Sequence, residues 1–344
     1  MLDGLTHEQQ MLHESTRRFV DEEMLPHEDL VDREGHVPIE LGRQIESRAK
    51  EIGLFAANLP ENVGGGGLDY TSMAVIEREF GRTSHALHAW VARPTELLLA
   101  TEGAQKEKYL APCVTGAKRE LFALSEPEAG SDIMSMKSNA KRDGDDWILN
   151  GSKHFISGPV MPDFAIVFAA TGCDETPRGS RTRITAFLVD VGMPGFDIQV
   201  GYNCVSYRGY LNFKLDFDNV RLGPDHILGE EGRGLELSGK WLGMGRIWVG
   251  ATCCGKAERL FEMATSWAAE RKQFGQAIGK FQATGFKLAD MAVELRAADL
   301  LVKDAINKAD QGVMTDSDAA MVKLYCSEML NRVADNTVQI YGGM

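Results

Sequence analysis

The spacing of apolar residues changes twice along the chain, and this change constrains the fold more than any other feature. Up to residue 120 the apolar residues recur with the period of helices. Short segments rich in β-branched and aromatic residues, separated by turn formers, then follow at 147–149, 164–168, 184–189, 196–200 and 211–217. No long helical pattern separates them. We therefore predict an α+β protein with an antiparallel β-barrel or sandwich between two helical parts.

These changes divide the 344-residue chain into three predicted domains. They are an N-terminal helical domain at 1–120, a β domain at 121–230 and a C-terminal helical bundle at 231–344. Helices this long need neighbours to bury their apolar stripes, so an antiparallel bundle is expected. The predicted bundle helices lie at 235–266, 277–311 and 317–341.

Start and stop signals predict the shorter elements. Thr6 opens a capping box, Pro38 precedes a second helix, and a further helix runs from Asp69 to about Gly81. Two more helices are predicted at 86–101 and 104–114, and a polar exposed loop at 174–183. The expected buried face of the second helix consists of Ile39, Leu41, Ile45 and Ile52.

Charge and cysteine content limit the class of protein. With 37 Lys and Arg against 50 Asp and Glu, the net charge is −13, which disfavours binding to nucleic acid or to an anionic membrane. No apolar run reaches membrane-spanning length and no signal-peptide pattern is present, so a cytoplasmic protein is expected. The six cysteines show no C-x-x-C spacing, which favours reduced thiols and no metal site.

One segment at the boundary between helical and β patterns is the first place to look for chemistry. The run Leu124–Asp132 concentrates small residues, hydroxyls and turn formers, so its backbone amides can approach an anionic or aromatic ligand. Three later segments are also candidates for chemistry: Asn150–Ser157, Glu270–Gly275 followed by Phe281-Gln282 and Leu288–Met291, and Gln339–Gly343. In order and spacing, the four segments resemble motifs of the acyl-CoA dehydrogenase family, and the resemblance covers nearly the whole chain.

The resemblance implies a fold, a cofactor and a reaction. The fold would have helical, β and helical-bundle domains and would assemble as a homotetramer or homodimer, with FAD between the β domain and the bundle. The reaction would be α,β-dehydrogenation of an acyl-CoA thioester to the 2-enoyl-CoA in fatty acid metabolism. An electron-transferring flavoprotein would reoxidise the cofactor. An acyl-CoA oxidase, or another flavoenzyme on the same fold, is the alternative in chemistry.

The same resemblance implies which residues contact the ligands. Those expected at the flavin are Phe122, Leu124, Ser125, Gly130, Ser131, Phe155, Ser157, Arg271, Gln273, Phe274, Gln282, Gln339, Gly342 and Gly343. Those expected at the substrate are Ser131 and Arg246. A guanidinium such as that of Arg271 can bind a pyrophosphate bidentately. Bulky residues that could line the acyl end are Trp90, Arg93, Pro94 and Leu97–Leu99.

Each of these assignments has a structural alternative that the sequence leaves open. The Leu124–Asp132 run could be a turn into a strand, Phe155 could belong to the β-domain core, and Arg271 could be a surface charge. The residues implied at the acyl end could equally be core. Paired glycines also terminate helices. Glu126 is expected to be a structural acid of the loop and not the catalytic base.

The chain departs from the family pattern at the position of the catalytic base. The resemblance implies a carboxylate either beyond the Gly342-Gly343 turn or immediately before Arg246, where this chain has Gly245. A glycine cannot abstract a proton. We therefore expect that the sequence given lacks a C-terminal segment that carries a Glu or Asp with a raised pKa. A non-catalytic flavin- or acyl-CoA-binding protein that has lost the base is the alternative outside enzymes.

Overall fold

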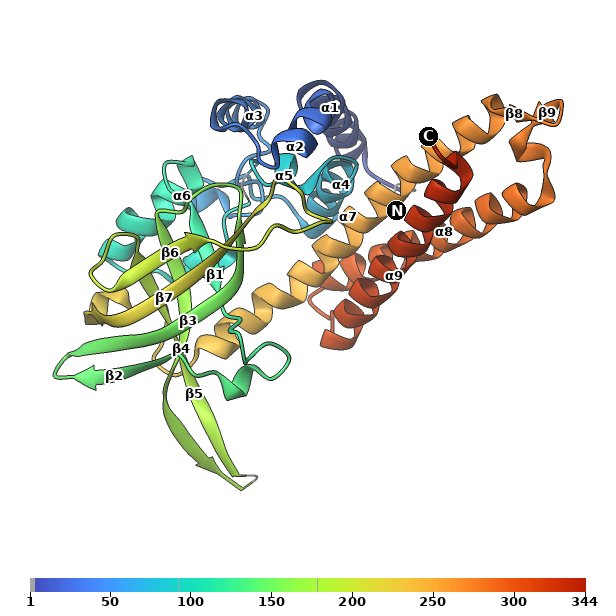
Figure 1. Ribbon diagram of the computed structural model, residues 1–344. Coiled ribbons are helices and arrows are strands. Elements are labelled where there is room, and N and C mark those ends of the chain that lie inside the picture. Colours follow the sequence, from blue (N-terminus) through green and yellow to red (C-terminus); the bar gives the residue numbers. More distant parts are fainter. Residues whose placement is uncertain (1–3, 92, 178) are drawn as a thin grey trace. The chain divides into compact units, whose positions relative to one another are not determined.

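A computed structural model describes residues 4–91, 93–177 and 179–344 (Figure 1). The chain forms two compact units, each of which is described by itself. The helical unit comprises Met1–His27, Leu68–His88 and Leu242–Met344, and the sheet unit comprises Glu28–Gly67 and Ala89–Trp241. The fold class is the predicted one, with helices at both ends of the chain and a β region between them.

The sheet unit is built on seven strands in one sheet. They are β1 (Glu120–Ala123), β2 (Asn139–Asp143), β3 (Asp146–Gly158), β4 (Phe164–Thr176), β5 (Gly179–Asp190), β6 (Phe196–Val200) and β7 (Leu211–Leu222). The strand order is β1-β4-β2-β3-β7-β6, and β5 pairs with β4. Most pairs are antiparallel as predicted, but β1 and β2 each pair with β4 in parallel. The described residues of the predicted exposed loop at 174–183 are mostly exposed as expected, but they do not form an irregular loop, because β4 and β5 pair there, Glu175 with Ser180.

The core of the sheet unit lies on the central strand β4. Phe164 to Ala169 are all fully buried, because this strand is covered on both faces and its sequence is a continuous apolar run. On one face Ala165, Val167 and Ala169 join an apolar cluster, which also contains Trp147. Phe164 instead packs against Tyr109, with ring centroids 4.7 Å apart.

Short helices complete the sheet unit. They are α2 (Glu28–Glu34), α3 (Ile39–Glu51), α6 (Ala111–Thr115), the single turns Glu61–Val63, Glu96–Ala100, Ile133–Ser135 and Pro224–His226, and the π-turn Lys106–Leu110. The predicted helix at 104–114 corresponds to the π-turn and α6. The predicted continuous helix at 86–101 is wrong, since only α5 (His85–His88) and the turn Glu96–Ala100 form there. Pro94 disfavours helical backbone in the residue before it.

Helix α3 starts after Pro38 as predicted, but its buried face differs from the prediction. Ile45 is buried, whereas Ile39 and Ile52 are 55% and 40% exposed. The helix instead turns its small residues inward, and a Cβ at Gly42 would overlap the indole of Trp90. The absence of a side chain at Gly42 therefore allows α3 to lie close to this tryptophan.

The helical unit contains the long helices. They are α1 (His7–Glu23), α4 (Tyr70–Phe80), α5, most of α7 (Gly234–Glu270), α8 (Gln282–Asp310) and α9 (Asp316–Tyr341), with the turns Leu25–His27 and Ile278–Lys280 and the short strands β8 (Lys272–Gln273) and β9 (Gln276–Ala277). The predicted capping box at Thr6 and the predicted start of α4 at Asp69 are confirmed. Helices α7, α8 and α9 run side by side in the predicted bundle (Figure 1).

Helices α4 and α7 cross with their backbones in contact. A Cβ at Gly81 would overlap the carbonyl oxygen of Thr252, and one at Gly255 would overlap that of Arg78. The close crossing brings the buried Arg78 within 2.7 Å of Glu258, and Asp299 of α8 lies 3.2 Å from the same guanidinium. The two acidic partners raise the pKa of Arg78 further above its already high range, although burial alone would lower it.

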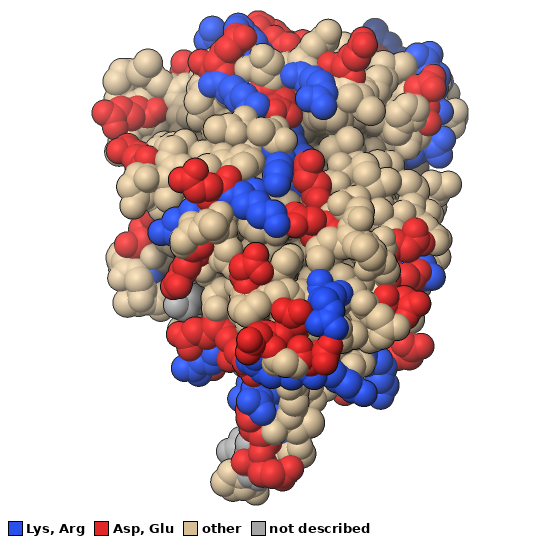
Figure 2. All heavy atoms as spheres, turned by 90° about the vertical axis from the view of Figure 1, so that its left-hand side faces the viewer, with Lys and Arg blue, Asp and Glu red and all other residues tan. Residues whose placement is uncertain are grey.

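Acidic and basic side chains are mixed over the face seen in Figure 2. That face shows no continuous basic patch of the kind that binds a phosphate backbone, as far as the drawn and described residues go. No helix in the described part of the chain has both the length and the apolar run that a membrane crossing needs.

Candidate functional site

A buried ion pair anchors the loop that follows β1 in the sheet unit. The side chain of Lys153, in β3, is fully buried, and its Nζ lies 2.7 Å from Oε1 of Glu126. The same Nζ donates a hydrogen bond to the carbonyl oxygen of Leu124 at 3.0 Å. One ammonium group therefore fixes both ends of the tripeptide that starts the Leu124–Asp132 run.

The carboxylate of Glu126 is fully engaged in structure. It accepts hydrogen bonds from the backbone N–H groups of Lys137 at 2.6 Å and Ser138 at 3.1 Å. Burial alone would raise its pKa, but the donors, Lys153 above all, lower the pKa of Glu126 below its ordinary value. A carboxylate held charged in this way is a poor base, so Glu126 has the structural role expected from the sequence.

An irregularity in β3 turns the next residues toward solvent beside this loop. The pairing of β3 with β7 shifts register between Lys153 and Ile156. The backbone N–H of His154 leaves the ladder and donates to the carbonyl oxygen of Ser125 at 2.9 Å. Phe155 takes a φ of +56° and its side chain is 60% exposed. The structure therefore brings Ser125 and Phe155, both predicted flavin contacts, to adjacent segments of backbone.

Two residues that the sequence analysis missed contact this irregularity. Tyr202, in the loop after β6, stacks on Phe155 with ring centroids 5.1 Å apart, and its hydroxyl lies 3.2 Å from Nδ1 of His154. Phe155 is therefore an exposed aromatic and not the core residue that its strand pattern allowed. A stacked pair in solvent offers a ready apolar platform for another planar group.

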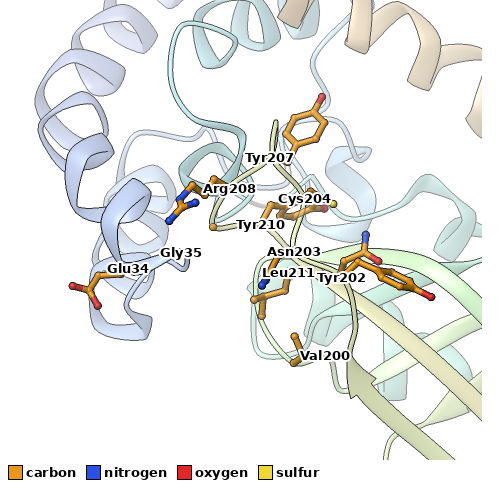
Figure 3. Close-up of a pocket in the computed structure, with 12 residues that line it drawn as sticks. Glu34, Gly35, Val200, Tyr202, Asn203, Cys204, Tyr207, Arg208, Tyr210 and Leu211 are labelled. Carbon is orange, nitrogen blue, oxygen red and sulfur yellow. The ribbon is translucent and has the colours of Figure 1, made fainter.

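Asn212 is the second missed residue. It pairs with Ser157 across the β3–β7 ladder, and its Nδ2 donates to the Ser157 hydroxyl oxygen at 3.3 Å. Its Oδ1 is buried without a hydrogen-bond partner among the described residues. The residue lines a cavity of about 260 Å³ between the end of α2 and the loop after β6 (Figure 3). No sequence signal marked it, because its relation to Ser157 arises only from strand register.

Other predicted flavin residues of the sheet unit differ in accessibility. Phe122 packs between Phe168 and Trp241, with centroid distances of 5.1 and 4.5 Å, and Leu124 is buried. Phe122 and Leu124 thus pack beneath the loop that follows β1. Gly130 and Ser131 are exposed at its tip.

In the helical unit, the connection after α7 is a β-hairpin. Lys272 pairs with Ala277 and Gln273 with Gln276. Phe274 and Gly275 form its tip with φ of +51° and +77°, which is the backbone of a type I′ turn. Phe274 is 94% exposed, so the hairpin holds a large apolar side chain out into solvent.

The remaining predicted residues of the helical unit lie near this end of the bundle. Arg271 lies over the ring of Trp267, 5.9 Å from its centroid, and Trp267 stacks on Tyr341 of α9 at 5.1 Å. The stack brings the last turn of α9 next to the end of α7. Gln282, Gln339, Gly342 and Gly343 are all exposed.

The predicted base position has open space around it, whereas residues of the predicted acyl end are buried. Gly245 lies within α7, and a Cβ added there would meet nothing within 4 Å. The next residue, Arg246, is half-buried. At the predicted acyl end, Trp90 and Leu97 are 3% and 2% exposed and belong to the core of the sheet unit, which is the structural alternative that the sequence left open.

Comparisons with known proteins cover the whole of this arrangement. Three family models match, described as acyl-CoA dehydrogenase N-terminal domain at residues 6–117, middle domain at 121–220 and C-terminal domain at 232–344. The chain is 34% identical to the caffeyl-CoA reductase-Etf complex subunit CarC of Acetobacterium woodii, over 97% of this chain and 87% of that protein.

Two solved structures are similar over the full chain. The structure of butyryl-CoA dehydrogenase from Megasphaera elsdenii has a TM-score of 0.87 and 33% identity, covering 100% of this chain and 90% of that one. An acyl-CoA dehydrogenase complexed with FAD from Bacillus anthracis has a TM-score of 0.88 and 26% identity, covering 100% of this chain and 61% of that one.

Proposed function

The chain belongs to the acyl-CoA dehydrogenase family of oxidoreductases, and from that premise we propose that it binds FAD and catalyses α,β-dehydrogenation of an acyl-CoA thioester to the 2-enoyl-CoA. One observation carries the proposal. The buried pair of Lys153 and Glu126 fixes a loop of small and hydroxyl residues beside the exposed Phe155. A loop held this firmly, with its tip open, is preorganised for a ligand.

The residues present fit a flavin. Phe155 offers an exposed ring and Ser157 an exposed hydroxyl. Gly130 leaves its surroundings open, since an added Cβ would meet nothing within 4 Å. Bound FAD would supply the hydride acceptor of the reaction. The protein would supply orientation and hydrogen bonds.

We assign the holding of the cofactor to two sets of residues. In the sheet unit, Ser125, Ser131, Phe155 and Ser157 would orient the ring system and the phosphate side, and Phe122 and Leu124 would support the loop from beneath. In the helical unit, Arg271 would bind pyrophosphate, with Gln273, Phe274, Gln282, Gln339, Gly342 and Gly343 around it. The exposed Phe274 favours contact with the cofactor of a second copy of the chain, which supports a homodimer or homotetramer.

As substrate contacts we propose Ser131 of the sheet unit and, separately, Arg246 of the helical unit; hydrogen-bond donors of this kind can stabilise negative charge that develops on a thioester oxygen. Gly245 has no group that can take the α proton. The space around it is open, so Gly245→Glu should place a carboxylate there without displacing neighbours. We expect this variant to increase the rate of substrate-dependent flavin reduction, measured by loss of absorbance under anaerobic conditions. No change in that rate would remove position 245 from the site.

An electron-transferring flavoprotein is the electron acceptor that we propose, because a relative's name includes an Etf complex. That name also describes a caffeyl-CoA reductase. Gly245 favours a second candidate, a homologue that binds flavin and acyl-CoA without turnover.

The deciding experiment adds FAD to the purified protein, removes oxygen and titrates with acyl-CoA and aryl-acryloyl-CoA. Loss of the flavin absorbance with an acyl-CoA supports the dehydrogenase. A spectral shift without reduction supports the binding homologue, and rapid peroxide formation on admitting air supports an oxidase. A protein that binds no FAD would overturn the proposal.

A further inference from the structure

The amide of Asn212 is placed between a cavity and the hydroxyl of Ser157. Asn212 is only 7% exposed. The residue lines the cavity; its Nδ2 donates to the Ser157 oxygen at 3.3 Å, while its Oδ1 is buried and has no hydrogen-bond partner among the described residues. The cavity measures about 260 Å³.

Counting donors and acceptors fixes the state of Ser157. A serine hydroxyl has one hydrogen to donate and two lone pairs to accept with. The Asn212 N–H occupies one lone pair and cannot take the hydrogen. That hydrogen points to the carbonyl oxygen of Phe155 at 3.4 Å, which is near the upper limit of a hydrogen bond. The hydroxyl hydrogen is therefore held weakly and can be offered to a better acceptor.

Polar side chains line the cavity beside Asn212. Tyr202 and Arg208 also line the cavity, and Figure 3 shows both on the loop that follows β6, with Glu34 and Gly35 on the opposite wall. Arg208 is engaged at the mouth by Asp32, whose carbonyl oxygen accepts from its Nε. The amide presents its N–H, and not its oxygen, to the Ser157 hydroxyl.

We propose that Asn212 is a positioning residue that keeps Ser157 a hydrogen-bond donor toward the flavin. The inference rests on the proposed function, since it needs a flavin beside Ser157. A donor at that place would favour the reduced cofactor, because reduction adds negative charge to its ring. Asn212 would act through Ser157 without touching the cofactor.

The test exploits the difference between an amide and a carboxylate of the same shape. Asn212→Asp replaces the donor with a pure acceptor, which takes the Ser157 hydrogen for itself. We expect an FAD dissociation constant about fivefold higher, as for the loss of one ~1 kcal/mol hydrogen bond, and a more negative reduction potential. Asn203→Asp, in the exposed loop at the same cavity, is the matched control for the added charge and should change the constant less than about twofold.

A double-mutant cycle separates positioning from packing. If Asn212 acts through Ser157, Asn212→Asp should have almost no effect on either quantity in a Ser157→Ala background. An equal effect in both backgrounds, or a larger effect of Asn212→Ala than of Asn212→Asp, would overturn the inference in favour of a packing role. Thermal unfolding of each variant shows whether it folds. Failure of the wild-type protein to bind FAD would instead overturn the proposed function.

Discussion

The two segments proposed to hold the cofactor are built in opposite ways. In the sheet unit, the loop after β1 is fixed by a pair of side chains, Lys153 and Glu126, that are 0% and 5% exposed. In the helical unit, the β8–β9 hairpin carries Phe274 at 94% exposure and is held by its own type I′ turn. One segment is ordered by the core of its own unit and the other presents its residues outward.

This contrast teaches that stability and binding are separable in the two segments. Changes beneath the loop should alter the free energy of unfolding first and cofactor binding as a consequence. Changes in the hairpin should alter binding and leave unfolding nearly unchanged.

The largest effect is expected from Lys153→Ala. It leaves the carboxylate of Glu126 buried without its cation, and breaking a buried pair in this way costs about 3–5 kcal/mol of unfolding free energy. Urea unfolding measures the loss. Lys137→Ala is the matched control, because only the backbone N–H of Lys137 contacts Glu126, and it should cost less than about 0.5 kcal/mol. A loss below about 1 kcal/mol for Lys153→Ala would contradict the anchoring role.

Arg271→Ala should reverse that pattern. Loss of a charge-assisted hydrogen bond of about 1.5–3 kcal/mol predicts FAD binding that is roughly 10- to 100-fold weaker, with unfolding unchanged. Fluorescence titration with FAD measures the dissociation constant. Lys272→Ala, the exposed neighbour in the hairpin, should have a much smaller effect. Equal effects of the two variants would show that only general positive charge matters.

Lowering the pH should reduce the free energy of unfolding more in the wild-type protein than in the Glu126→Gln variant, because only the wild type has a carboxylate at position 126 to protonate. The folded state lowers the pKa of Glu126, so its contribution to stability is complete above its unfolded pKa of about 4.5 and is lost as pH falls through the folded value. A tenfold change in proton affinity corresponds to about 1.4 kcal/mol of stability. The stability gap between wild type and Glu126→Gln, measured by urea unfolding from pH 7 to 3, should therefore narrow in acid. Burial would raise the pKa of Glu79, but its partners His13 and Arg17 lower it to about 2. Glu79 is present in both proteins, so its protonation should not change the gap between them. A gap independent of pH would contradict the pairing.

The smallest effect on stability is expected from Phe274→Asn. The side chain makes little contact with its own unit, and asparagine tolerates the φ of +51° better than phenylalanine does. The free energy of unfolding should stay within about 0.5 kcal/mol of wild type, while FAD binding weakens. Phe281→Ala, at a half-buried partner ring 6.1 Å away, should destabilise more. The reverse order would show that the hairpin is part of the core.

Elements with strong periodicity could be predicted from the sequence, because local signals determine them. Helix α4 begins at its Asp69 cap, and the three bundle helices form where long apolar stripes require neighbours. The continuous helix predicted at 86–101 does not form, because Pro94 disfavours helical backbone in the residue before it and apolar content alone does not reflect this restriction. An irregular loop does not form at 174–183, because a polar hairpin can pair its backbone without burying its side chains.

The candidate site could be predicted in part for the same reason. Ser125, Phe155 and Arg271 lie in recognisable motifs, and their roles stay predictions. Tyr202 and Asn212 were missed because they meet Phe155 and Ser157 only in the folded chain, across more than forty residues of sequence. Tertiary pairing of this kind leaves no trace in the local sequence.

The glycine contacts between α4 and α7 determine where this protein can vary. Any side chain at Gly81 or Gly255 would separate the two backbones, and the separation would also draw Arg78 away from Glu258. Random mutagenesis with selection for folded protein should therefore find these two positions nearly invariant, while the exposed hairpin around Phe274 accepts many residues. The least variable positions would then be two glycines at a helix crossing within the helical unit, which have no proposed role in binding or catalysis.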